Sequence, residues 1–161
     1  MADIISDGMT KVSWVTTITS VTAPTAVELN AGIALESFIT PDGLNITPTQ
    51  DMVDTSSLAS TQDSEVPGRY KETGELVFKQ QGYAGPPWKT FDDTTPGVRP
   101  AGFLVTRIGK PAASVFAAAD VVTIRSVKVG RRNELPATKN EVVKFSMPVA
   151  IQQTTQAVAV V

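Results

Sequence analysis

The residue types that most often carry chemistry are scarce in this chain of 161 residues. It contains no cysteine and no histidine, which removes thiolate nucleophiles, the usual zinc ligands and every Ser-His-Asp or Cys-His relay. What remains are 16 acidic side chains, 14 basic ones and two tryptophans. Any chemistry would therefore have to come from carboxylates or from exposed aromatic rings.

Four carboxylates in one polar stretch are the strongest candidates for a cation site. Asp51, Asp54, Asp63 and Glu65 could surround a hard cation such as calcium. Their spacing matches no known calcium-binding loop, and acids in a polar loop more often keep it soluble or position it against a neighbour. We predict no metal site and assign these four residues to inter-subunit contacts.

The remaining candidates for chemistry are weaker. Asp92 and Asp93 are adjacent, so they point apart on a strand and lie about 100° apart on a helix, a poor acid-base pair. Glycines occur in Pro-Gly and Gly-Pro turns and not in a phosphate-binding pattern. Trp14 and Trp88 could form a binding platform, but isolated aromatics in β-rich chains more often pack in the core. The sequence predicts no enzyme and no cofactor.

The elements that would position these residues are predicted to be mainly β-strands. Residues 11–21 are rich in β-branched side chains, and residues 142–151 alternate apolar with polar side chains. A Pro-Asp-Gly turn at 41–43 should make a hairpin. The remaining strands are expected at 33–39, 44–46, 71–80, 102–108 and 121–129. The apolar residues predicted to face the core in the last strand are Val143, Phe145, Met147, Val149 and Ile151.

One short helix is predicted from its capping residues. Thr25 as N-cap and Glu28 three residues later form a capping box, and Gly32 supplies the C-terminal cap. Trp88 and Phe91 should anchor a further short helical turn. The predicted architecture is one domain over residues 1–161, a β-sandwich or barrel with one or two short helices and a long polar loop.

Three segments suit contacts with neighbours better than they suit a core. The polar loop, at about 45–69, is longer than connections in compact domains usually are. The C-terminal tail, at about 152–161, ends in small apolar residues that a lone monomer gains little by exposing. The third segment is the N-terminal arm, at about 1–10. In the tail, we expect a partner to cover Val158, Val160 and Val161.

Charge and hydropathy bear on partners and on location. The formal net charge of −2 argues against wrapping of DNA. A basic cluster at Arg125, Lys128, Arg131 and Arg132 is interpreted as a solvated strand end. No apolar run approaches the roughly 20 residues that a membrane helix needs, and the first residues lack a basic and apolar leader pattern. We expect a soluble, unsecreted protein with no membrane span.

Several segments, in their order and local composition, are similar to those of one known family. Residues 24–32, Pro-Thr-Ala-Val-Glu-Leu-Asn-Ala-Gly, lead into a strand and are followed by the polar residues 51–58. Residues 88–97 then run into the strand at 102–109. This order resembles that of the major tail proteins, or tail tube proteins, of long-tailed bacteriophages, over most of the chain but without any invariant catalytic signature.

The resemblance implies a structural virion protein. Its protomers would form hexameric rings that stack into a hollow tail tube around a tape-measure protein and meet tail-end proteins. Double-stranded DNA would pass through the lumen without specific binding, and assembly would take place in the host bacterial cytoplasm. The N-terminal arm, the polar loop and the C-terminal tail would make most of the contacts between rings.

Other functions remain open from the sequence. A decoration or connector protein of the virion would be equally β-rich and equally free of catalytic residues. A carbohydrate- or host-surface-binding module would need Trp14, Tyr83 and Trp88 on an exposed platform. An enzyme that used carboxylates alone would need two of them facing one pocket about 5–10 Å apart.

Overall fold

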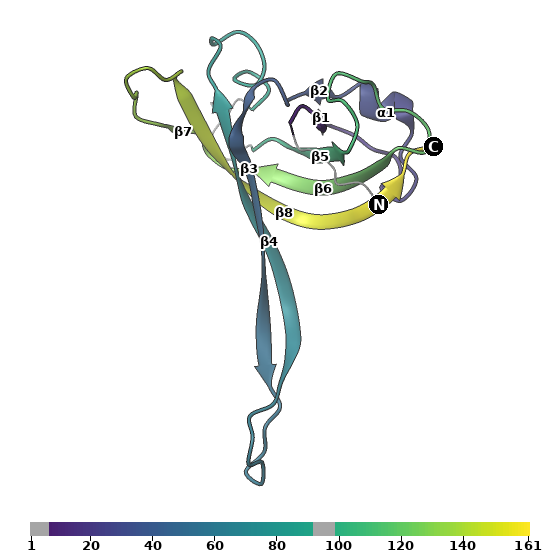
Figure 1. The fold of residues 1–161 in the computed structure, drawn as a ribbon, viewed down its shortest axis with the longest axis vertical. Helices are drawn as coiled ribbons and strands as arrows, with labels where there is room; N and C mark the ends of the chain where they lie inside the picture. The colour runs from purple at the N-terminus through teal and green to yellow at the C-terminus, as the bar shows by residue number, and fades with distance from the viewer. Residues whose placement is uncertain (1–6, 92–98) are drawn as a thin grey trace.

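The computed structural model of the chain describes residues 7–91 and 99–161, which fold into eight β-strands and one short α-helix (Figure 1). Asp92 and Asp93 lie outside the described residues, as do residues 1–6 of the N-terminal arm. The elements are β1 (Thr10–Val15), α1 (Ala26–Asn30), β2 (Ile33–Ala34), β3 (Ile39–Asp54), β4 (Glu65–Lys79), β5 (Ala101–Ile108), β6 (Val121–Val129), β7 (Asn133–Glu134) and β8 (Lys144–Ala159).

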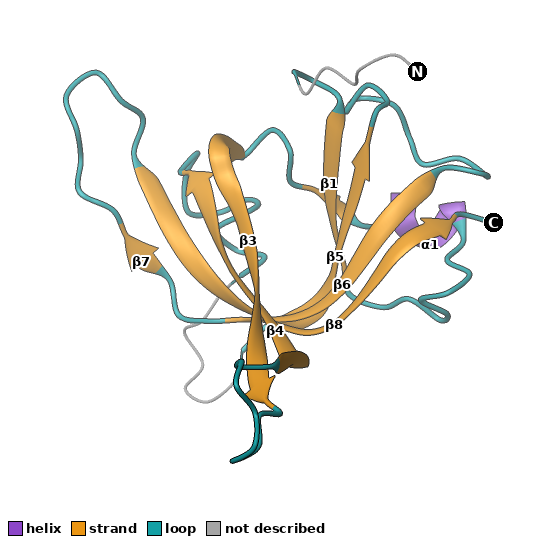
Figure 2. Ribbon diagram, turned by 60° about the horizontal axis from the view of Figure 1, so that its bottom comes forward, coloured by secondary structure: helices purple, strands orange, loops and turns teal. Residues whose placement is uncertain are grey.

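All the described strands belong to one antiparallel sheet, which confirms the predicted mainly β class. The strand order is β2-β1-β5-β6-β8-β4-β3, with the short β7 paired to β8. Figure 2 shows that the sheet is bent, with β3 and β4 on one side and β1 and β5 on the other. β8 is 16 residues long and runs through the bend, pairing with β4 in its first half and with β6 in its second.

The larger core lies inside the bend and closes it. Trp14 of β1 and Phe78 of β4 lie near opposite ends of the strand order, yet both pack on Phe91, with ring centroids 5.0 and 5.5 Å from that of Phe91. Phe145 of β8 packs on Phe78 at 5.3 Å. Full burial of a large apolar side chain contributes about 1.5–3 kcal/mol. Trp14 is thus a core residue, as predicted, and Phe91 joins the two sides of the sheet.

A second core covers the opposite face of the sheet. Leu29 of α1 and Phe116 of the loop after β5 are buried against Ile124 of β6. β6 contributes side chains to both cores because successive side chains on a strand point to opposite faces. Its residues Val122 and Ile124 face the second core, whereas Val127 and Val129 face the first. Both faces of the central strands are therefore covered by the chain itself.

The polar stretch predicted to be a loop is for the most part a long β-hairpin. The hairpin predicted at 41–43 is wrong, because β3 runs through these residues as one strand, and a register shift against β4 between Ile39 and Leu44 accommodates the extra residues. Beyond it, β3 and β4 stay paired as far as Asp54 and Glu65, and only residues 55–64 are irregular. The loop boundaries of 45–69 are therefore wrong, because ladder hydrogen bonds can hold a polar strand that has no buried face.

The helix begins as predicted but ends differently. The amide of Glu28 donates to Thr25 Oγ1 at 3.3 Å and the amide of Thr25 donates to Glu28 Oε2 at 3.1 Å, so the capping box is confirmed. The C-cap is Ala31 and not Gly32. Gly32 is needed for space, since a Cβ there would lie 2.6 Å from Ser13 Oγ and 2.7 Å from Val15 Cγ2.

Two smaller predictions concern the segments at 85–91 and 142–151. Backbone hydrogen bonds from Lys89 to Gly85 and from Phe91 to Pro87 form the expected helical turn. In β8, Phe145, Met147 and Val149 are buried and Ile151 is partly buried, as predicted. Val143 is exposed, since it lies before the first residue of β8 and outside the core.

Candidate assembly surfaces

The most prominent surface is the outer part of the β3–β4 hairpin, which projects from the body of the molecule (Figure 1). β4 pairs with β8 only as far as Thr73 and Ala150, so we call residues 48–72 the arm. The arm pairs β3 with β4 from Pro48 and Glu72 to Asp54 and Glu65. Large apolar side chains lie exposed on it: Met52, Val53, Leu58, Val66 and Tyr70.

The four carboxylates singled out in the sequence lie on the outer part of the arm and are exposed. Asp54 and Glu65 stand directly opposite each other in the last paired position. Hydrogen bonds from Ser56, including its amide at 2.7 Å, lower the pKa of Asp54, so this carboxylate stays charged. Among residues 7–91 and 99–161, no group of acidic side chains is arranged to hold a metal ion.

The root of the arm is fixed to the sheet by a polar cluster. Glu72 Oε2 accepts a hydrogen bond of 2.5 Å from Thr154 and lies 3.6 Å from Arg125 Nε. A groove of about 610 Å³ opens beside this cluster, where β4 and β8 diverge. Arg125 is therefore an anchor for the arm, and its interpretation as part of a solvated strand end is wrong. Besides Glu72 and Thr154, the groove is lined by Pro48, Thr49, Gln50, Tyr70 and Gln156.

Beyond this fork, β8 has a free edge. From Val149 to Ala159 it pairs with β6 on one side, and none of the described strands pairs with its other side after Ala150. An unpaired edge presents backbone N–H and C=O groups that can add a strand from another chain. The outer edge of β3 is likewise the end of the sheet. Both edges are places where a neighbouring sheet can be added.

The C-terminal residues are not the exposed apolar patch that we expected. Val158 and Val160 are buried in the second core of their own chain. The amide of Val160 donates to Asp120 O at 2.9 Å, and the amide of Val161 donates to Pro24 O at 2.9 Å. The expectation that a partner covers Val158 and Val160 is therefore wrong, because both pack in the same cluster as Leu29 of α1. Val161 remains exposed.

The described part of the N-terminal arm is tied down in a similar way. Gly8 O accepts a hydrogen bond of 2.8 Å from the amide of Ala112, and Met9 O accepts one of 3.0 Å from Gly109. Residues 7–10 therefore border the loop that follows β5. The predicted contact role of residues 1–6 falls outside the described part of the chain.

The end of the molecule opposite the arm carries basic and aromatic side chains. We call residues 79–91 and 128–144 the basic pole. Arg132 stacks over Trp88 at 3.6 Å and donates to Trp88 O at 2.7 Å, so it holds the turn that carries Trp88. Tyr83 packs edge-on against Trp88 and is largely exposed. Because Trp14 is buried and Trp88 lies under Arg132, the structure lacks the three-aromatic platform that a carbohydrate-binding module would need.

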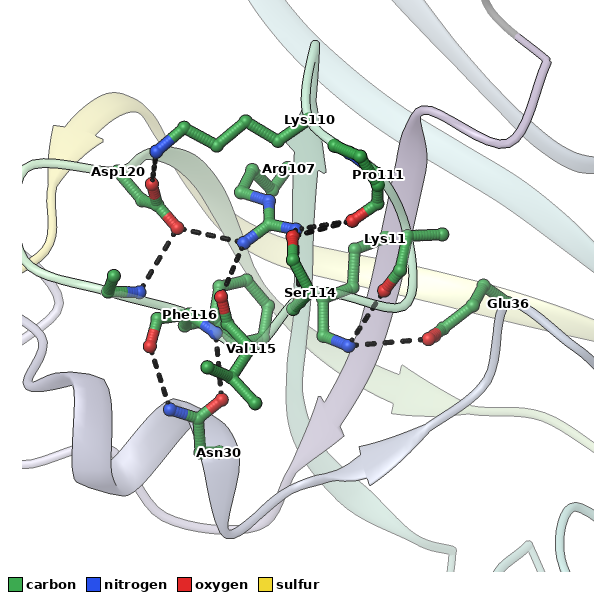
Figure 3. Close-up of polar contacts among 12 residues, drawn as sticks. Lys11, Asn30, Glu36, Arg107, Lys110, Pro111, Ser114, Val115, Phe116 and Asp120 are labelled. Atoms are coloured by element: carbon green, nitrogen blue, oxygen red, sulfur yellow. Dashed lines mark hydrogen bonds and ion pairs between the residues drawn. The ribbon is translucent and has the colours of Figure 1, made fainter.

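A buried ionic cluster fixes the loop between β5 and β6 (Figure 3). Arg107, which is 2 % exposed, donates to Asp120 Oδ2 at 2.8 Å and to the Val115 carbonyl at 2.8 Å. It also donates to the Pro111 carbonyl and to Ser114 Oγ, at 2.9 and 2.6 Å. The Arg107 guanidinium thus holds the loop between β5 and β6 over the second core. Sequence reasoning missed it, although a lone arginine in the apolar run of residues 102–108 was a usable signal.

Asp120 balances the charge of Arg107 inside this cluster. Burial by itself would raise the pKa of Asp120, but hydrogen bonds from Lys110, the amide of Ala117 and Arg107 outweigh burial and lower that pKa to about 2. The Asp120 carboxylate is therefore ionised at neutral pH. The cluster thus holds the loop over part of the second face of the sheet.

A family model supplies the identification. The model, described as phage tail tube protein, matches residues 1–161. The chain belongs to this family. The expected family is confirmed, and the protein is a structural component of the virion tail. None of the helices in the described residues is long and apolar enough to cross a membrane.

Two solved structures are similar in fold to this tail tube protein. One is a hybrid structure of the SPP1 tail tube, with a TM-score of 0.65 and 8% identity, covering 99% of this chain and 81% of that one. The other is the baseplate of the anti-feeding prophage, 6-fold symmetrised, with a TM-score of 0.62 and 12% identity over 98% of both chains. No curated protein matches the chain. The resemblance in fold thus extends over the arm as well as over the body.

Proposed function

We propose that this tail tube protein polymerises as hexameric rings that stack into the hollow tube of a phage tail. The observation that carries the proposal is the arm, a two-stranded ribbon with exposed apolar side chains that projects from the body and contributes to neither buried core of its own chain. A monomer gains nothing from holding such a ribbon in solvent, because exposed apolar strands invite association. A neighbouring subunit that covers the arm explains its presence.

Ring closure is supported by the free sheet edges. The unpaired side of β8 beyond Ala150 and the outer edge of β3 lie at different places on the sheet. If one edge of a protomer pairs with a different edge of the next, the contact is heterologous, and repetition closes a ring when the rotation allows it. Such a ring removes the open edges that a single protomer exposes.

Stacking is supported by the shape of the molecule. The arm extends along the longest dimension of the chain, away from the basic pole (Figure 1). An arm that contacts the next ring makes a second heterologous contact, and one that does not close on itself produces an open-ended filament. The same chain can therefore make both a ring and a tube.

The remaining parts of the proposal concern partners and place. The lumen would enclose a tape-measure protein during assembly in the host cytoplasm and later pass double-stranded DNA, and the ends of the tube would meet tail-end proteins. A formal net charge of −2 suits a wall that does not bind DNA tightly. We assign no catalytic activity to the protein, since without cysteine or histidine it has none of the common nucleophilic relays.

Negative-stain electron microscopy of the purified protein over a range of concentrations tests this function. We expect rings with a central hole at low concentration and tubes of uniform diameter at high concentration, with six-fold symmetry in end-on class averages. A protein that stays monomeric at every concentration, or that forms sheets without a lumen, would contradict the proposal. A decoration or connector protein would give single rings or monomers that never elongate.

A further inference from the structure

We propose that the acidic arm of one copy docks on the basic pole of a second copy, so that the tube grows head to tail by charge pairing between rings. The inference rests on the proposed function, and it names the surface of the neighbour that receives the arm. The partner is a second copy of this chain, chosen because the two surfaces are complementary in charge and in apolar character.

The arm and the basic pole carry opposite charge. The arm carries five acidic side chains, Asp51, Asp54, Asp63, Glu65 and Glu72, against two basic ones, Arg69 and Lys71, and its residues 48–68 contain no lysine or arginine. The basic pole contains only two acidic side chains, Glu134 and Glu141. Its seven basic side chains are Lys79, Lys89, Lys128, Arg131, Arg132, Lys139 and Lys144.

One strand connects the two surfaces and also separates them. β4 begins at Glu65 on the arm and ends at Lys79 in the basic pole, 15 residues later. At about 3.3 Å per residue, the two ends lie about 50 Å apart. A rigid strand of that length prevents the arm from folding back on the pole of its own chain. The two surfaces can therefore meet only between different copies.

Like charges face each other at both ends of this strand. Asp54 stands opposite Glu65 on the arm, and Lys79 stands opposite Lys144 at the basic pole. Like charges directly opposite each other on neighbouring strands are destabilising. Within the chain, a 2.9 Å ion pair with Glu141 partly offsets the repulsion that Lys144 experiences. The isolated chain thus has repulsion at both ends, and the docking of opposite ends relieves both.

Exposed apolar side chains accompany the charges on both surfaces. Met52 and Val53 on the arm, and Val142 and Val143 at the basic pole, are each about half exposed or more. Interfaces commonly combine an apolar centre with a charged rim that sets register and suppresses wrong contacts. The arm and the pole each supply both components. Charge then selects the opposite end of another copy, since arm against arm and pole against pole repel each other.

The test uses charge reversal in two regions and their combination. The arm variant is Asp51→Lys with Glu65→Lys, and the pole variant is Arg131→Glu with Lys139→Glu, all at exposed positions. Each variant places like charges at the contact, and we expect each to raise the critical concentration for tube formation about tenfold or more. The combined variant restores opposite charges and should return to within about threefold of the wild type.

Two further measurements separate charge pairing from loss of structure. The control Asp42→Lys with Glu75→Lys makes the same change in net charge on the same two strands but outside the arm, and we expect it to assemble as the wild type does. An equimolar mixture of the arm and pole variants should form tubes in which the two alternate. Circular dichroism confirms that each variant is folded, and pelleting at rising salt should show wild-type assembly weakening as charges are screened.

The outcomes distinguish this inference from the function on which it rests. A wild-type protein that never forms tubes defeats the proposed function itself. Wild-type tubes together with an arm variant that assembles normally, or a combined variant that fails as badly as the single-region variants, would leave the function intact and overturn the charge-paired docking.

Discussion

At the scale of single residues, the most consequential side chain is one that never reaches the surface. Arg107 makes hydrogen bonds to three carbonyl groups of the loop and an ion pair with Asp120. Removing one partner of a buried pair leaves the other charge without compensation, which typically costs about 3–5 kcal/mol. This cluster determines whether the loop covers the second core, and through it whether α1 and the C-terminus stay in place.

We predict that Asp120→Ala lowers the free energy of unfolding by about 3–5 kcal/mol at pH 7. The pKa of Asp120 in the folded protein is about 2, below its ordinary value of 3.8, so its contribution is complete above about pH 4 and is lost as the pH falls towards 2. Urea unfolding at pH 7 and at pH 3 measures both effects. The difference between wild type and variant should shrink at the lower pH, whereas the exposed Asp42→Ala control should change little; an equal difference at both pH values would contradict this account.

At the scale of elements, α1 depends more on its ends than on its length. It has only five residues, too few for a stable isolated helix. Hydrogen bonds from Thr19 and Thr25 lower the pKa of Glu28 to about 2, so the capping carboxylate is charged at neutral pH. The helix then buries Leu29 in the second core. Caps and one buried side chain thus hold an element that propensity alone could not.

We predict that Thr25→Ala lowers the free energy of unfolding by about 1 kcal/mol, because the amide of Glu28 loses its acceptor. Thermal unfolding should detect this as a fall of about 2–4 °C in Tm. Thr16→Ala is the matched control, since Thr16 is an exposed threonine outside the helix, and it should change stability by less than about 0.5 kcal/mol. Equal effects of the two substitutions would show that the cap does not matter.

At the scale of the whole molecule, folding and assembly use different parts of the chain. Both cores lie in the body, and no residue of the arm contributes to either buried cluster. The arm is joined to the body by β-strand continuity and by the polar cluster around Glu72. We therefore expect the body to fold without the outer arm, whereas the stacking of rings that we propose requires it.

We predict that a chain with residues 51–69 replaced by Asn-Gly folds but does not form tubes of normal length. Gln50 and Tyr70 are opposite each other in the hairpin, so a two-residue turn can join them without a change of register. Tm should stay within a few degrees of the wild type, since neither core is touched. Electron microscopy should show monomers or short ring stacks. Tubes of wild-type length would refute a role for the arm in stacking.

The sequence by itself determined the properties that depend on residue type and on short-range pattern. The absence of cysteine and histidine argued against the common nucleophilic relays, the capping box located α1, and alternation predicted the buried residues of β8 from Phe145 to Val149. These signals are readable because each follows from a single residue type or from neighbours within a few positions.

Only the tertiary structure decided the arm, the C-terminus and the Arg107 cluster. The arm buries neither face, so its strands show no apolar period and owe their form to pairing between residues up to 24 positions apart, such as Pro48 and Glu72. The sequence predicted Val158 and Val160 to be exposed, whereas in the fold they share a buried cluster with Leu29 of α1. In each case the contact that determines the structure joins segments distant in the sequence. Such contacts produce no local sequence pattern from which they could be predicted.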